Sequence, residues 1–142
     1  MNDDPQRYPA HPTRTDAERL IAWLPILYAP DFQVEVPRKE GAGPWYPEYT
    51  REVEDFYREL AGAVWVDYGY YPAEANAMLV PERVATATLP EIRSMLTLCL
   101  RSERFGDGNW GGAISRGMVR WLLERVGVLM GEGGFPDAVE ES

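Results

Sequence analysis

The stretch "LTLCLRSERFGDGNWGG", residues 96–112, holds the side chains best suited to binding an anion. A guanidinium group presents a planar fork of N–H donors that fits carboxylates and phosphates. Arg93, Thr97, Arg101 and Arg104 fall on one side of a helical wheel, next to a wide apolar face. This spacing predicts an arginine ridge whose stems are buried while the charged heads reach a partner.

The glycine turn "FGDGNWGG" lets backbone N–H groups approach an anion, and the start of the next helix adds the positive end of a helix dipole. The predicted ligand-binding residues are Arg93, Thr97, Arg101, Arg104, Gly108 and Trp110. In the alternative interpretation the arginines pair with the acidic helix near residues 50–60, or cap the carbonyls of their own helix. The turn is not a phosphate loop, because no G-K-[ST] follows the glycines and the G-x-G-x-x-G spacing is absent.

Histidine and cysteine chemistry is disfavoured. The single histidine, His11, lies in a proline-rich segment, which argues against Ser-His and Cys-His catalysis and against most zinc sites. Cys99 lies on the apolar face of its helix and is expected to be a small core residue. We therefore predict no catalytic residue, no metal ligand and no cofactor. Carboxylate chemistry is the alternative: Asp67 among aromatics, or Asp107 in the glycine turn, as acid or base. For Asp67 the simpler role is a hydrogen bond to a backbone N–H or a tyrosine hydroxyl.

Length and charge narrow the class of protein. The chain has 142 residues, the size of one domain, and 45% of them are hydrophobic. Its net charge of −9 disfavours nucleic-acid binding. Residues 88–130 are the exception, with six arginines against four carboxylates. No apolar run is long enough to span a membrane and one cysteine fits a reducing compartment, so we expect a cytoplasmic protein.

Periodicity and capping signals predict the elements that position these residues. A capping box at Thr15–Glu18 begins a helix that Pro25 should kink or end. Residues 32–36 alternate between apolar and polar side chains, which predicts a short strand. Helical patterns follow at 50–61, 73–79, 88–105 and 112–130. The helix at 88–105 begins at a capping box at Thr88–Glu91. The aromatics Trp65, Tyr68 and Tyr71 are expected to close one end of the core.

These elements predict a mainly α fold: a single-domain bundle of about four to five helices with at most a small β-hairpin. Residues 1–14 are expected to be a flexible N-terminal arm, residues 15–130 a single helical domain, and residues 131–142 an acidic flexible tail.

The segment "LPEIRSMLTLCLRSERFGDG" resembles the signature of an uncharacterised bacterial family, I-R-x-L-L-T-x-x-x-R-x-x-R-F-x-x-G, followed by an amphipathic helix. Upstream, "LIAWLP" and "YTREVEDFY" are similar to further patterns of that family, so the resemblance covers roughly residues 17–126. The turn "GDGNWGG" is richer in glycine than the family pattern. The family is a domain of unknown function, so the resemblance implies a shared fold and no activity. The matching positions are Arg93, Thr97, Arg101, Arg104, Phe105 and Gly108.

The sequence favours a non-enzymatic binding module that recognises a small anion or an acidic protein segment through the arginine ridge. The alternative is a small carboxylate-dependent enzyme that uses Asp67 or Asp107 as acid or base. Neither nucleic acid nor membrane is expected as a partner. Trp45 and Trp110, if exposed, favour a homodimer contact.

Overall fold

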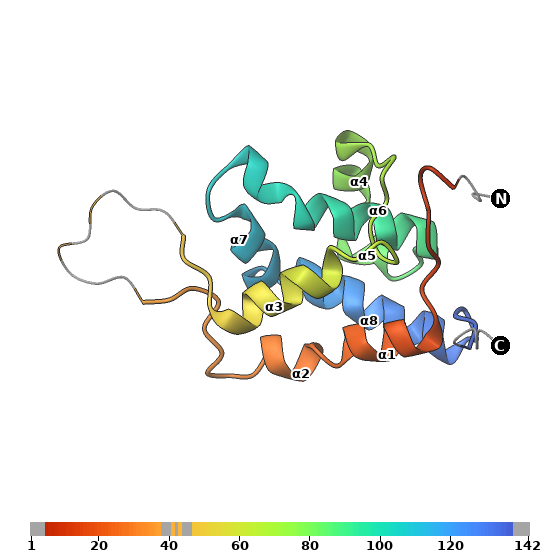
Figure 1. Cartoon of the computed structure of the whole chain (residues 1–142), viewed down its shortest axis with the longest axis horizontal. Helices are drawn as coiled ribbons and strands as arrows, with labels where there is room; N and C mark the ends of the chain where they lie inside the picture. The colour runs from red at the N-terminus through yellow and green to blue at the C-terminus, as the bar shows by residue number, and fades with distance from the viewer. Residues whose placement is uncertain (1–4, 38–40, 42, 44–46, 138–142) are drawn as a thin grey trace.

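The computed structural model describes residues 5–37, 41, 43 and 47–137 and shows a mainly α-helical chain (Figure 1). Its elements in chain order are α1 (Arg14–Ile21), α2 (Leu24–Leu27), α3 (Arg51–Leu60), α4 (Pro72–Met78), α5 (Pro81–Val84), α6 (Leu89–Leu100), the 3₁₀ helix η1 (Ser102–Phe105), α7 (Asn109–Ser115) and α8 (Met118–Gly131). The mainly α class is confirmed. The described residues form more helices than the four or five predicted, because three of the predicted helical stretches are divided and the short α5 was not predicted.

A proline and a glycine account for two of these divisions, and a second glycine precedes α7. Pro25 lies in the first turn of α2, where a missing N–H is tolerated, so the predicted break after α1 is confirmed. Gly108 and Gly117 precede α7 and α8 with φ angles of 90° and 88°, a left-handed conformation that residues with a Cβ avoid. The single helix predicted at 112–130 is therefore wrong, since Gly117 separates α7 from α8.

Capping sets the ends of the other helices. The box predicted for α6 is confirmed: the backbone N–H of Thr88 donates to Glu91 Oε1 at 2.8 Å. The box of α1 is formed by Thr13 and Asp16, not by the predicted Thr15–Glu18 pair, so this helix begins earlier. The third division lies after Leu100, where α6 ends and the tighter η1 follows, although one helix was predicted to reach residue 105.

Helix α6 lies at the centre of the molecule, between α4, α7 and α8 (Figure 1). Eight of its twelve residues are buried, so it is covered on nearly every side. Trp110 is only 2% exposed, because its ring stacks on Phe56 at 5.7 Å between ring centroids. The expectation of an exposed Trp110 is therefore wrong.

The aromatic segment before α4 is only partly buried. Trp65 is in the core, whereas Tyr68 and Tyr71 are 49% and 64% exposed, which contradicts their predicted place in the core. The end of the core is closed instead by Phe135, whose ring meets Trp65 edge-on at 6.2 Å. The predicted strand is reduced to an isolated antiparallel bridge between Glu35 and Tyr49.

The two ends of the described chain meet at one side of the molecule. The backbone N–H of Arg14 donates to the carbonyl of Pro136 at 2.7 Å, so the start of α1 is fixed to the segment after α8. Trp45, the other tryptophan expected at a dimer contact, lies outside the described residues. None of the helices in the described ranges is long and apolar enough to cross a bilayer.

Candidate functional site

Arg93, the first residue of the predicted ridge, is a buried residue. It is 3% exposed, and its Nη2 donates to the carbonyls of Ala63 and Val66 at 2.9 and 3.0 Å. Burial lowers the pKa of Arg93, since desolvation disfavours the cation. Thr97 is also buried: its hydroxyl donates to the Arg93 carbonyl and accepts from the backbone N–H of Asp67, each at 2.8 Å. These two side chains join α6 to the segment before α4.

Asp67 is fully buried and ion-paired. Arg7 donates from Nε to Asp67 Oδ1 at 2.7 Å and from Nη2 to Oδ2 at 2.8 Å, a bidentate pair. This hydrogen bonding raises the pKa of Arg7 above its usual range. The backbone N–H of Gly69 and the hydroxyl of Tyr8 donate to the same carboxylate, at 2.9 and 3.4 Å. The hydrogen bonds expected for Asp67 from a backbone N–H and a tyrosine are present, and the arm residue Arg7 adds an ion pair.

The glycine turn binds an anion, and that anion belongs to the chain itself. Glu103 accepts from the backbone N–H of Gly108 at 3.1 Å and from that of Trp110 at 2.8 Å, so its carboxylate caps the first turn of α7. Tyr49 donates to the same carboxylate at 2.8 Å and accepts from the backbone N–H of Gly111 at 3.1 Å. Burial raises the pKa of the Tyr49 hydroxyl.

Arg101 and Arg104 are the members of the predicted ridge that solvent reaches. Arg101 lies over the ring of Tyr70, with 5.2 Å between the guanidinium carbon and the ring centroid. Neither arginine forms an ion pair with the described residues. Because α6 ends at Leu100, the two residues do not continue its helical spacing. The structure therefore does not bring the six predicted ligand-binding residues together into one surface.

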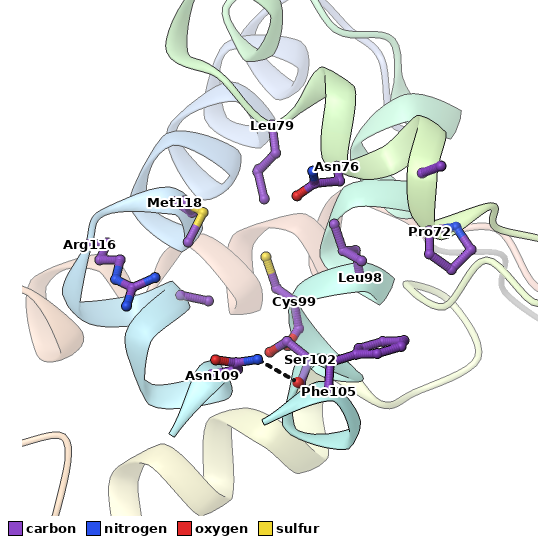
Figure 2. Close-up of a pocket in the computed structure, with 12 residues that line it drawn as sticks. Pro72, Asn76, Leu79, Leu98, Cys99, Ser102, Phe105, Asn109, Arg116 and Met118 are labelled. Carbon is purple, nitrogen blue, oxygen red and sulfur yellow. Dashed lines mark hydrogen bonds between the residues drawn. The ribbon is translucent and has the colours of Figure 1, made fainter. Parts of the chain in front are cut away.

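The same stretch lines an open pocket of about 450 Å³ with other residues (Figure 2). Its lining comes from α4, α6, η1, α7, α8 and the residues next to them, and it is mostly apolar. The residues are Pro72, Ala73, Asn76, Leu79, Leu98, Cys99, Ser102, Phe105, Asn109, Ala113, Arg116 and Met118. Five of these twelve lie between residues 96 and 112. This volume lies in the ~300–1,000 Å³ range of small-molecule sites.

Besides Ser102, whose hydroxyl donates to the Cys99 carbonyl at 2.6 Å, three polar side chains line the pocket with almost no partners among the described residues. The Asn109 amide donates from Nδ2 to the Ser102 carbonyl at 3.2 Å, the dashed line in Figure 2. Neither the Asn76 amide nor the Arg116 guanidinium makes a hydrogen bond or ion pair with the described residues, and Arg116 is the only charged residue in the lining. Phe105, at 67% exposed, is the most exposed large apolar side chain of the described part.

Cys99 lies in this lining but is only 2% exposed, so its expected place in the core is confirmed. Burial raises the pKa of its thiol to about 12, which leaves almost no thiolate near neutral pH. Asp107, the second candidate acid or base, is exposed and lines a neighbouring hollow with Glu35; that hollow shares Asn109 and Arg116 with this pocket.

The pocket was not predicted from the sequence, because the prediction rested on the arginines near residues 96–112 and not on the apolar residues between them. Leu98, Ser102 and Phe105 are spaced four and three residues apart, which is a helical face in its own right. That face was the available signal. Asn76 and Leu79 carry no such signal, because only the packing of α4 against α6 brings them to the pocket.

Fold and pocket together define a mainly α-helical module with an open, mostly apolar cavity and a cationic side chain in its lining. The chain belongs to a family of unknown function, DUF6508, whose sequence model matches residues 12–132. The match agrees with the expected membership of a family that has no assigned activity. Comparison with curated proteins and with solved structures found no match.

Proposed function

We propose that this protein is a non-catalytic binding module, and that the pocket lined by α4, α6, η1, α7 and α8 binds an amphipathic anion. Such a ligand places an apolar group against Leu79, Leu98 and Met118 and a carboxylate or phosphate near Arg116. An acidic protein segment with a bulky apolar side chain offers the same chemistry as a small amphipathic acid.

The observation that carries this proposal is Arg116, which lies in a mostly apolar lining and forms no ion pair with the residues that the structure describes. A guanidinium without a carboxylate partner, next to an apolar surface, favours a ligand that is both anionic and apolar. The amides of Asn76 and Asn109 supply the polar groups that orient a ligand in such a pocket.

The arrangement of the arginines supports a revised version of the ridge hypothesis. Arg93 is engaged in internal contacts, and the turn at Gly108 and Trp110 is occupied by Glu103. Arg101 and Arg104 form no ion pair within the described part of the chain; Arg104 lies in η1 with Phe105, and Arg101 directly precedes η1. A partner larger than a small acid is expected to engage these two residues as well.

The proposal is tested with a series of straight-chain and aromatic carboxylates, and with acidic peptides that contain one Leu or Phe. Binding is measured by thermal shift and by calorimetry. We expect the affinity to rise with the apolar size of the probe. Arg116→Gln is expected to weaken binding by roughly tenfold or more, since a hydrogen bond to a charged group is worth about 1.5–3 kcal/mol.

Arg83→Gln is the matched control, because Arg83 is an exposed arginine of α5 with no ion pair among the described residues and no place in the pocket lining. Asn76→Trp fills the pocket from α4 without removing a side-chain hydrogen bond, and should abolish binding. Equal dissociation constants for Arg116→Gln, Arg83→Gln and the wild type would refute the assignment of this pocket.

A further inference from the structure

We infer that the surface under residues 5–8 is a docking groove for an Arg-Tyr segment, and that the arm of a second copy of this chain docks in the same groove. In the structure the chain's own Arg7 and Tyr8 occupy it. This groove is separate from the pocket of the proposed function.

The groove recognises the guanidinium by charge and by shape. Asp67 is completely buried and uses both carboxylate oxygens to hold Arg7. Gly69 makes room for the stem: a Cβ at that position would lie only 3.0–3.3 Å from Arg7 Cδ, Cγ and Nε. Its backbone N–H also donates to Asp67 Oδ1 at 2.9 Å, which fixes the carboxylate toward the arginine.

The phenol ring is recognised by a second charge. Tyr8 covers the buried guanidinium of Arg93, with 4.7 Å between the guanidinium carbon and the ring centroid. Arg93 Nε has no hydrogen-bond acceptor among the described residues, which leaves one buried donor of this cation unsatisfied there. Burial also raises the pKa of the Tyr8 hydroxyl, and that hydroxyl reaches Asp67 Oδ2 at 3.4 Å.

A main-chain contact fixes the register of the segment. The backbone N–H of Tyr68 donates to the carbonyl of Arg7 at 3.1 Å. A carboxylate, a glycine, a cation and a backbone donor thus act on two consecutive residues. This combination selects an Arg-Tyr pair rather than any basic segment.

The groove and its occupant are separable parts of the chain. The start of α1 is fixed without the arm, by the Thr13–Asp16 capping box and by the bond from Arg14 to Pro136. The family match begins at residue 12, so Asp67 and Arg93 lie inside it whereas Arg7 and Tyr8 precede it. Release of residues 5–8 therefore leaves the family domain in place.

An empty groove is unfavourable, which is why a second arm should bind. Release of the arm removes the cation that pairs with Asp67, and losing one partner of an ion pair that is buried while the arm is in place is costly. A second copy carries the identical Arg-Tyr segment, so reciprocal exchange restores every contact and joins two chains. In the exchanged pair each copy supplies two residues of the other copy's site.

The first test uses the full-length variant Arg7→Ala/Tyr8→Ala, whose groove is intact. The probe is a synthetic peptide of residues 5–13, PQRYPAHPT, and the control peptide has Ala in place of Arg and Tyr. We expect the probe to raise the Tm of the variant in a saturable way, because it binds the folded state alone. The control peptide should leave the Tm unchanged. An equal rise in Tm with both peptides, or no rise with either, would overturn the proposal. If the double variant does not fold, Arg7→Ala replaces it as the receptor, because it too frees the Asp67 carboxylate, and it is judged by the same criterion.

The second test supplies the arm from another copy. Full-length Asp67→Asn keeps the arm and weakens the groove, so it is mixed with Arg7→Ala/Tyr8→Ala and examined by native mass spectrometry. We expect a heterodimer in the mixture and monomers from each variant alone. Folded variants that stay monomeric when mixed, at a concentration where the peptide binds, would overturn the exchange between copies.

Discussion

At the scale of single residues, identical side chains in one stretch have different roles because their surroundings differ. Arg93 is enclosed by the carbonyls of Ala63 and Val66 and by the ring of Tyr8. Arg101 is half-buried and lies against one tyrosine ring. A buried guanidinium with two carbonyl partners contributes to the fold, whereas one that solvent still reaches contributes less to stability.

We therefore expect Arg93→Met to lower the free energy of unfolding by about 2–4 kcal/mol, because two buried carbonyls lose their donor. Arg101→Met should cost about 1 kcal/mol or less, the scale of an exposed cation–π contact. Urea denaturation followed by circular dichroism measures both. Similar losses in the two variants would show that burial does not distinguish these arginines.

At the scale of elements, the connection from η1 to α7 depends on the close approach of Tyr49 to the helix backbone. A Cβ on Gly111 would lie 2.6 Å from a ring carbon of Tyr49, so no side chain fits at this position. Tyr49 in turn donates to Glu103, which caps α7. The glycine thus serves packing in this turn, and the anion site is occupied by the chain's own carboxylate.

Gly111→Ala is expected to lower the free energy of unfolding by about 1–3 kcal/mol, since Tyr49 or α7 must shift. Gly127→Ala is the matched control, because its Cβ meets nothing within 4 Å inside α8. There alanine should stabilise the protein by about 0.5–1 kcal/mol through its higher helix propensity. Thermal melts of both variants give the comparison, and destabilisation by both would contradict the packing argument.

The sequence predicted the helices whose start and apolar face are set by a few consecutive residues. The capping box at Thr88 and the apolar face of α3 are visible in a few consecutive residues, and both helices begin within one residue of the predicted start. Gly117 lies inside the single helix predicted at 112–130, because the apolar spacing continues across it and its left-handed φ leaves no signal in the sequence. The burial of Trp110 depends on Phe56, which lies far away in sequence and leaves no local trace.

At the scale of the whole molecule, several buried acids hold their protons more tightly in the folded state. Burial raises the pKa of Cys99 from its ordinary value near 9 to about 12, and it also raises the pKa values of Tyr28 and Tyr49. A raised pKa in the folded state means that the unfolded chain releases these protons first. Their contribution to stability is complete below about pH 9 and is lost as the pH rises through the folded-state values.

The free energy of unfolding should therefore fall between about pH 8 and about pH 10.5. Cys99→Ala removes one of the groups, so its fall over this range should be smaller than that of the wild type. Chemical denaturation at the two pH values measures the difference. An equal fall in both proteins would mean that the Cys99 thiol ionises in the folded state as readily as in the unfolded chain.

The proposed function requires that the anionic ligand binds in the apolar pocket and not at the glycine turn. Amide chemical shifts, followed by NMR during titration with the tightest carboxylate or acidic peptide, locate the site directly. The proposed function predicts saturable shifts at Asn76, Cys99, Ser102 and Ala113, and their loss in Asn76→Trp. The contradicting result is a set of shifts confined to Gly108, Trp110 and the Arg93–Thr97 region that stays unchanged in Asn76→Trp. That result would place the binding site at the arginine ridge.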